Sequence, residues 1–116
     1  MLKLYGIPNC NTVKKARDWL EKNGFAYEFQ DFKKIDVSAD LLENWLMQIP
    51  REQLINRAGL TWRGLESSVK DNIIDNASAI ALMRAKTSVI KRPVLIKDNK
   101  ILSLGFDEVT YKKLIK

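Results

Sequence analysis

Residues 2–23 read LKLYGIPNCNTVKKARDWLEKN, and the change of period inside this stretch decides the fold. Residues 2–7 alternate and stop at Pro8-Asn9, which is typical of a strand that ends in a turn. Apolar side chains then recur at helical spacing over residues 11–23, where an Asn-Gly pair provides a helix stop. Residues 25–32 (FAYEFQDF) alternate again. The opening therefore predicts strand, helix and strand, and a right-handed crossover makes the two strands parallel.

The middle of the chain predicts a helical block. Ser38 can cap a helix with one apolar face, and Pro50 suits the first turn of a shorter helix that follows it. Residues 57–63 (RAGLTWR) are predicted to be a turn-rich connection, and further helical pieces are expected to start at Ser67-Ser68 or at Asp75-Asn76. We expect this block to be an insertion over about residues 38–88.

The end of the chain returns to strands. Residues 93–97 (PVLIK) and 101–104 (ILSL) are strand-like and flank Asp98-Asn99, a hairpin turn, and a last amphipathic helix is expected after Gly105. The whole chain thus predicts an α/β fold with a mixed sheet, in the order β-α-β, helical insertion, β-β-α. At this length we expect a single domain over residues 1–116.

Composition restricts the partners. No apolar run approaches the roughly 20 residues of a membrane span, and the first residues lead into a strand-like segment, so we expect a cytoplasmic protein without a membrane partner. The net charge of +6 raises the question of nucleic acid, but the basic residues are scattered in pairs. We therefore expect no nucleic-acid binding and favour an anionic small ligand or an acidic partner.

The chain contains one cysteine, Cys10, and no histidine. An intramolecular disulfide, the usual structural zinc sites, and Ser-His or Cys-His catalysis are thereby excluded. Any catalysis must use thiol, carboxylate or arginine chemistry, and we expect no bound metal.

Cys10 follows a predicted strand and stands at the start of a predicted helix. Free N–H groups and the helix dipole favour a thiolate there, and Lys14 and Lys15 are expected to lower the thiol pKa further. Asn11 and Thr12 can donate hydrogen bonds to the sulfur or to an anion beside it. The alternative is a buried and inert thiol, but a Pro-Asn-Cys-Asn-Thr turn is too polar for a core position.

Three segments of the sequence, residues 5–20 (YGIPNCNTVKKARDWL), 56–63 (NRAGLTWR) and 90–93 (IKRP), carry a family resemblance. The chain resembles the arsenate reductase (ArsC) family, which has a thioredoxin-like fold, and more closely its branch of YffB-type proteins, regarded as glutathione-dependent thiol reductases. The resemblance implies that Cys10 is the catalytic nucleophile and that Arg57 and Arg92 bind anionic groups. It also implies a cis Pro93, beside which an extended peptide such as glutathione can bind.

Two departures from the family pattern narrow the expected function. Residues 104–108 (LGFDE) contain no arginine where the family's arsenate reductases carry one, so arsenate is the less suited substrate. Val13 occupies the place of a resolving cysteine, so an external thiol must complete any redox cycle. We expect a monomeric monothiol reductase with glutathione as co-substrate, no bound cofactor, and an unidentified small or protein thiol or disulfide substrate. The alternatives are an Spx-like regulator that binds RNA polymerase and a catalytically silent scaffold.

Overall fold

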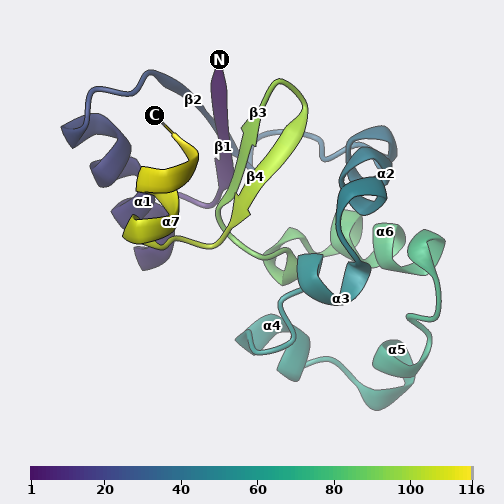
Figure 1. Cartoon of the computed structure of the whole chain (residues 1–116). Coiled ribbons are helices and arrows are strands. Elements are labelled where there is room, and N and C mark those ends of the chain that lie inside the picture. The colour runs from purple at the N-terminus through teal and green to yellow at the C-terminus, as the bar shows by residue number, and fades with distance from the viewer. Residues whose placement is uncertain (116) are drawn as a thin grey trace. The chain divides into compact units, whose positions relative to one another are not determined.

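The computed structural model describes residues 1–115, and these fold into two units that we treat separately. The sheet unit contains residues 1–36 and the chain from Arg92 onward, and the helical unit contains residues 37–91. In chain order, the helical unit therefore lies between the two segments of the sheet unit, as the colours of Figure 1 show.

The sheet unit is built on four strands, β1 (Leu2–Gly6), β2 (Tyr27–Asp31), β3 (Val94–Lys97) and β4 (Lys100–Leu104). Their order in the sheet is β2-β1-β3-β4. Strands β1 and β2 are parallel, as the opening of the sequence predicts, whereas β3 is antiparallel to both β1 and β4. Asp98 and Asn99 form the β3–β4 turn with positive φ angles of 52° and 66°, the backbone of a tight hairpin.

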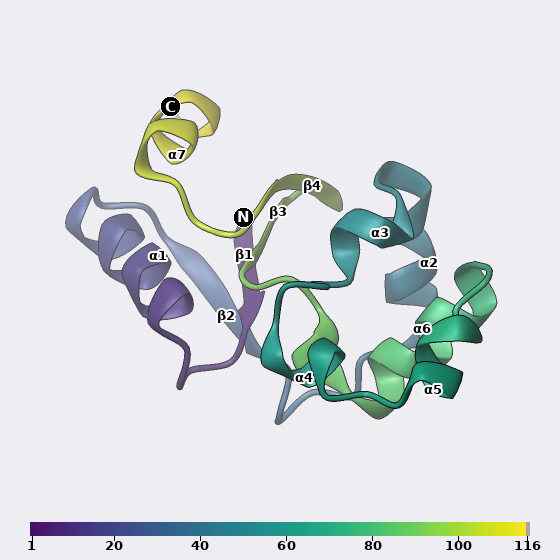
Figure 2. The same cartoon turned by 90° about the horizontal axis from the view of Figure 1, so that it is seen from below.

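Two helices, α1 (Asn11–Lys22) and α7 (Glu108–Leu114), cover the same face of this sheet (Figures 1 and 2). The apolar stripe of α1 meets α7 and the sheet in one core cluster, whose buried members are Leu2, Leu4, Ala16, Trp19, Leu20, Leu95, Tyr111 and Ile115. Gly24 and Gly105 adopt φ angles of 75° and 78°, which glycine adopts readily, and they end α1 and β4. This packing fixes the start of α1 relative to the end of β1.

The helical unit contains short helices, two of which begin at side-chain caps. The elements of this unit are α2 (Ala39–Gln48), α3 (Arg51–Leu54), α4 (Leu60–Arg63), α5 (Ser67–Asp71), α6 (Asn76–Ala85) and the 3₁₀ turn η1 (Thr87–Val89). Ser38 accepts a hydrogen bond from Leu41 N at 3.1 Å, and Asp75 and Ser78 form a reciprocal capping box. Helix α2 packs against α6, with Trp45 buried (Figure 2).

Two local predictions in this unit are corrected by the structure. Residues 57–63, predicted to be only a turn-rich connection, contain the one-turn helix α4, which Gly59 starts and which packs against η1. A single turn is too short to show helical periodicity in the sequence. Pro50 lies one position earlier than predicted, at the N-cap of α3 rather than inside its first turn.

Candidate functional site

The site around Cys10 lies at one edge of the sheet. Because β1 and β3 are antiparallel, with Tyr5 paired to Val94, the loop that leaves β1 lies beside the residues that enter β3. Cys10 is the N-cap residue of α1, and Arg92 and Pro93 immediately precede β3. The Arg92–Pro93 peptide bond is cis, as the family resemblance implies. The Pro93 carbonyl accepts a hydrogen bond from Gly105 N at 2.9 Å, which brings the end of β4 to the same edge.

Several opposing influences act on the half-buried thiol of Cys10. Burial alone would raise the pKa of Cys10, because it disfavours the charged thiolate. The backbone N–H of Val13, a hydrogen bond from Arg92, the positive charge of Arg92 and the backbone N–H of Thr12 together outweigh burial and lower the pKa. Cys10 makes no full capping hydrogen bond, but the first turn of α1 still stabilises the thiolate electrostatically.

The N–H groups of the first turn of α1 act on the thiol as the sequence predicts, but the charge that acts on it is not the one that the sequence suggested. Arg92, 82 positions along the chain from the thiol, lowers the pKa of Cys10, whereas Lys14 and Lys15 are not among the causes. Lys14 and Lys15 instead line two depressions on the flanks of α1. Asn11 and Thr12 have exposed side chains, and it is the Thr12 backbone N–H that acts on the sulfur.

Arg57 belongs to the helical unit, so its part in the site stays a prediction. Its side chain is exposed, and its guanidinium lies 5.4 Å from the ring centroid of the buried Trp62. The backbone that carries it is held locally, since Asn56 N donates to Val89 O at 2.7 Å and Ile55 pairs with Ile90. The segment just before Arg57 is thus hydrogen-bonded to residues 89–90, near the end of the helical unit.

The segment without the expected arginine uses its carboxylates locally. The Asp107 carboxylate accepts hydrogen bonds from the Thr110 hydroxyl at 2.6 Å and the Thr110 backbone N–H at 3.1 Å, and these two bonds lower the pKa of Asp107. Glu108 lies 3.8 Å from Lys112. Phe106 packs edge-on against Tyr111, with ring centroids 4.8 Å apart. Residues 104–108 therefore begin and anchor α7.

Residues 1–115 contain neither a cluster of metal-ligating side chains nor a membrane-spanning helix. Within this range, no group of three or more histidine, cysteine, aspartate or glutamate side chains is placed to hold a metal ion. None of the helices in this range is long and apolar enough to cross a membrane.

The individual contacts of two α1 residues, Val13 and Arg17, did not follow from the sequence. The Val13 backbone N–H acts on the thiolate, and its side chain lies against Gly6, where an added Cβ would be 2.8 Å from Val13 Cγ2. Arg17 is held against β2 by a hydrogen bond from its Nε to the Tyr27 hydroxyl at 3.1 Å. Val13 and Arg17 are four residues apart and therefore neighbours on the surface of α1, but no sequence signal shows what either side chain touches.

Solved structures of known proteins are similar to this chain over nearly its whole length. The protein YffB is 38% identical with a TM-score of 0.92, and the similarity covers 100% of both chains. An arsenate reductase (ArsC) related protein from Brucella melitensis is 47% identical with a TM-score of 0.78, covering 99% of this chain and 94% of that one. The fold is thus the thioredoxin-like fold of ArsC-related proteins.

A second group of relatives consists of regulators. The global transcriptional regulator Spx of Streptococcus agalactiae is 26% identical over an alignment of 114 positions that covers 93% of this chain and 78% of Spx. The ArsC family itself matches residues 5–114, nearly the full length. This match and the ArsC-related neighbours support an activity of the thiol oxidoreductase kind. The chain belongs to the ArsC family.

Proposed function

We propose that this protein is a cytoplasmic, monomeric monothiol reductase that uses glutathione as co-substrate, with Cys10 as its nucleophile. The observation that carries the proposal is the lowered pKa of the half-buried Cys10, caused by the first turn of α1 and by Arg92. A thiol with a lowered pKa is ionised at a pH where an ordinary cysteine is not, and the thiolate is the nucleophile.

The proposed reaction has two exchange steps. In the first, the Cys10 thiolate attacks the glutathione sulfur of a mixed disulfide, and the substrate leaves as a thiolate. In the second, a glutathione thiolate attacks the resulting Cys10–glutathione disulfide, which releases oxidised glutathione and restores the Cys10 thiolate. In the net reaction, the mixed disulfide and one glutathione thiol become the substrate thiol and oxidised glutathione, and the departing substrate thiolate takes up the proton that the attacking glutathione gave up. The second thiol must come from outside because Cys10 is the only cysteine in the chain.

The binding roles follow from chemistry and from family membership. Guanidinium groups bind carboxylates through paired hydrogen bonds, so we assign Arg92 and Arg57 to the anionic groups of glutathione or of the substrate. We assign Asn11 and Thr12 to the same ligand, since both are exposed next to Cys10. Pro93, beside Arg92, is assigned to the wall against which the peptide lies.

Arsenate is the less suited substrate for this site. The oxyanion of arsenate calls for several cations, and residues 104–108 supply none. Asp107 and Glu108 are engaged with Thr110 and Lys112, so they are no obstacle in themselves. The argument against arsenate therefore rests on the missing arginine alone.

The rate of alkylation of Cys10 by iodoacetamide, measured against pH, tests the proposal. The native protein should react at a lower pH than free cysteine does, because the pKa of Cys10 is lowered. Arg92→Gln should raise the pKa of Cys10 and move the profile to higher pH. Lys14→Gln removes the same charge from the helix that bears the thiol and should leave the profile unchanged.

Turnover is the second arm of this experiment. Cys10→Ser should abolish glutathione-dependent reduction of a mixed disulfide such as that between glutathione and β-mercaptoethanol. A native thiol that alkylates no faster than free cysteine near neutral pH would overturn the proposal. So would Cys10→Ser protein that keeps its full glutathione-dependent activity.

An Spx-like regulatory role is the second candidate, favoured by the relatives that are transcriptional regulators. A regulator with a two-cysteine switch would need a second thiol, and Val13 occupies its expected place. Recovery of RNA polymerase subunits with the purified protein, together with the absence of thiol-dependent turnover, would favour this role over catalysis.

A further inference from the structure

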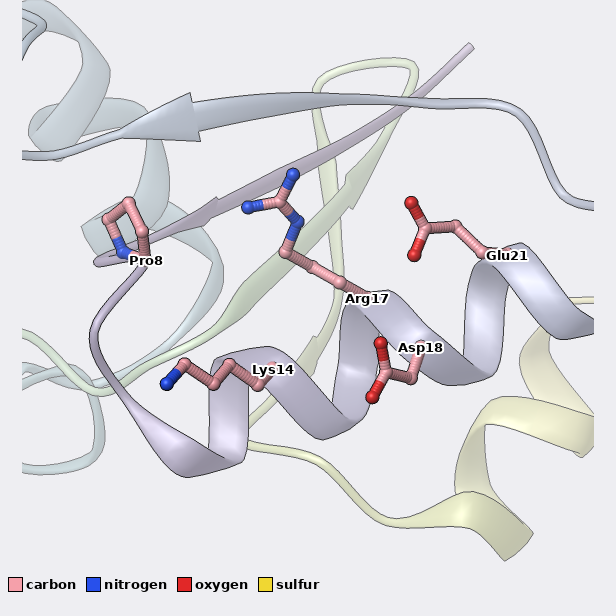
Figure 3. Close-up of a pocket in the computed structure, with 5 residues that line it drawn as sticks. All are labelled: Pro8, Lys14, Arg17, Asp18 and Glu21. Atoms are coloured by element: carbon pink, nitrogen blue, oxygen red, sulfur yellow. The ribbon is translucent and has the colours of Figure 1, made fainter.

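A depression of about 230 Å³ runs along one flank of α1, and the proposed reaction does not use it. It is lined by Pro8, Lys14, Arg17, Asp18 and Glu21 (Figure 3). Pro8 belongs to the loop that carries Cys10, and the other four residues follow along α1 for two turns. The depression therefore starts beside the thiol loop and leads away from it.

Arg17 is held rigidly at this depression. Its Nε donates to the Tyr27 hydroxyl at 3.1 Å, and its guanidinium carbon lies 4.1 Å from the centroid of the Phe29 ring. Tyr27 and Phe29 are two residues apart on β2, so their side chains lie on the same face of the strand. Stacking and the hydrogen bond fix the plane of the guanidinium. The N–H groups of its two terminal nitrogens therefore point in fixed directions.

These terminal nitrogens have no protein partner within residues 1–115. Lys14 and Asp18, and likewise Arg17 and Glu21, are four residues apart on the helix, yet neither pair approaches within 4.0 Å in the described chain. A cation that precedes its carboxylate is the weaker orientation for such a pair. Figure 3 shows Arg17 and Glu21 projecting from α1 toward β2 with their charged ends apart.

The order of charges defines what the depression can bind. The two cations, Lys14 and Arg17, lie nearer the thiol loop, and the two carboxylates, Asp18 and Glu21, lie nearer the end of α1. A purely anionic ligand would meet repulsion from the carboxylates, and a purely cationic one would meet repulsion from the fixed guanidinium. A ligand with both charges close together satisfies both ends. One helical turn, about 6 Å along the axis, separates Arg17 from Glu21.

We propose that this depression binds an α-amino-acid head group, whose carboxylate pairs with Arg17 and Lys14 and whose ammonium pairs with Glu21 and Asp18. The γ-glutamyl end of glutathione carries such a head group, and so does a free amino acid. We assign the site to the γ-glutamyl end, a choice that rests on the proposed function. Glutathione would then extend from the flank of α1 around Pro8 to Cys10.

The test uses Cys10→Ser protein, which cannot form a mixed disulfide, and amide NMR spectra recorded during titration with S-methylglutathione. The amides of Lys14, Arg17, Asp18 and Glu21 should shift. S-methylcysteinylglycine lacks the γ-glutamyl end and should bind about tenfold more weakly or worse, the effect of losing roughly 1.4 kcal/mol. Free glutamate should shift the same amides at higher concentration.

Variants test the two ends of the site separately. Arg17→Gln and Glu21→Gln should each weaken S-methylglutathione binding about tenfold. Lys22→Gln removes a charge from the same helix outside this depression and should leave the affinity within about twofold. Glu21 is exposed, so we expect Glu21→Gln to fold like the native protein. Arg17→Gln loses a contact with Phe29, and a circular dichroism melt shows whether that loss affects folding.

The outcomes separate this inference from the proposed function. Equal S-methylglutathione affinity of the proteins with Arg17 and with Arg17→Gln would refute the site, even if the native protein shows glutathione-dependent turnover. Equal affinity for S-methylglutathione and S-methylcysteinylglycine would refute it as well. If the protein shows no glutathione-dependent turnover but glutamate still binds in an Arg17-dependent way, the proposed function fails and the amino-acid site stands.

Discussion

The sheet unit and the helical unit hold their backbone in different ways. In the sheet unit, β1 pairs with strands that lie 25 and more than 85 positions away, and Cys10 and Arg92 meet because of that pairing. In the helical unit, the side chains of Ser38 and Asp75 cap α2 and α6. Each accepts a hydrogen bond from the backbone N–H three residues further along the chain. The thiol therefore lies where long-range backbone pairing fixes its surroundings, and the inserted unit is shaped mostly by local interactions.

The two units also differ in what they expose. In the helical unit, Met47, Leu60 and Ile74 are at least 72% exposed, whereas the large exposed side chains of the sheet unit are Met1, Val109 and Leu114. Scattered exposed apolar residues are ordinary on protein surfaces, and they mean little individually. The most exposed of these side chains lie in the helical unit, and substitutions at those positions should change stability little.

The largest effects are expected from one identical substitution in each core. Leu20 and Leu54 are both fully buried, and Leu20→Ala or Leu54→Ala should lower the free energy of unfolding by about 2–5 kcal/mol. We expect one unfolding transition in both variants, because an unfolded insertion would become a long loop between β2 and β3, and its closure entropy would oppose the pairing of β3 with β1. Urea unfolding followed by circular dichroism measures this.

Two transitions in the Leu54→Ala variant would contradict that expectation. The sheet unit would then persist after the helical unit had unfolded, and the chain would comprise two domains. Tryptophan fluorescence distinguishes the units, because Trp19 lies in the sheet unit and Trp45 and Trp62 lie in the helical unit.

A second pair of substitutions compares close backbone approaches. A Cβ added at Gly6 would lie 2.8 Å from Val13 Cγ2, a fully buried branched side chain that cannot move away. Gly6→Ala should therefore cost about 1–3 kcal/mol of stability and displace the start of α1. Since the Val13 N–H lowers the pKa of Cys10, the thiol pKa should rise in this variant. Urea unfolding and the pH profile of alkylation measure the two effects.

Gly59→Ala is the matched substitution in the helical unit. Its Cβ would lie 2.9 Å from Asn56 Nδ2, the end of a side chain that can rotate away. We expect a smaller loss of stability than for Gly6→Ala and no change in the thiol pKa. A larger loss at Gly59 would mean that the helical unit is the more tightly constrained of the two.

Much of the sheet unit follows from sequence patterns. The alternation of residues 2–7 and 25–32, the helical period between them and the Asp98-Asn99 turn all correspond to observed elements. In the helical unit, Ser38 was predicted as a cap and is one. The helix α4 was missed because four residues carry too little periodicity.

The environment of the thiol was harder to predict than the fold. Charge near Cys10 in the sequence suggested Lys14 and Lys15, but helical geometry turns both onto the flanks of α1. Arg92 acts on the sulfur only because β3 lies antiparallel to β1, and no local pattern around Arg92 signals that. Family resemblance named Arg92 as an anion-binding residue, and its effect on the thiol pKa required the structure.

A moderate effect is expected at the start of the helical unit. Ser38→Ala removes the side-chain oxygen that accepts a hydrogen bond from Leu41 N, and it should lower stability by about 1 kcal/mol. Ser38→Asp restores an acceptor and should recover most of the loss, as measured by urea unfolding. A loss of glutathione-dependent activity in Ser38→Ala beyond the loss of folded protein would contradict the view that this helix start has only a local role.

The smallest effect, of opposite sign, is expected in the core of the sheet unit. The Tyr111 hydroxyl is buried without a hydrogen-bond partner within residues 1–115, while its ring packs edge-on against Trp19 and Phe106. Tyr111→Phe keeps both ring contacts and removes only the unpaired hydroxyl, so stability should stay equal or rise by up to about 1 kcal/mol. Tyr27→Phe is the control, since it removes a hydroxyl that accepts a hydrogen bond from Arg17 and should destabilise by about 0.5–1.5 kcal/mol.

Alkaline unfolding sharpens the Tyr111 comparison. Burial raises the pKa of Tyr111, so in the folded protein its hydroxyl stays protonated when the unfolded chain ionises at about pH 10. Unfolding above that pH then releases a proton, and the native protein loses stability as the pH rises. Tyr111→Phe has no hydroxyl to ionise on unfolding and lacks this loss. Its advantage in stability over the native protein should therefore widen as the pH rises from about 9 to about 11. Tyr5, whose pKa is also raised by burial, is present in both proteins and cancels from the difference. A constant difference across this range would mean that the Tyr111 hydroxyl reaches solvent and ionises at the same pH in the folded and the unfolded chain.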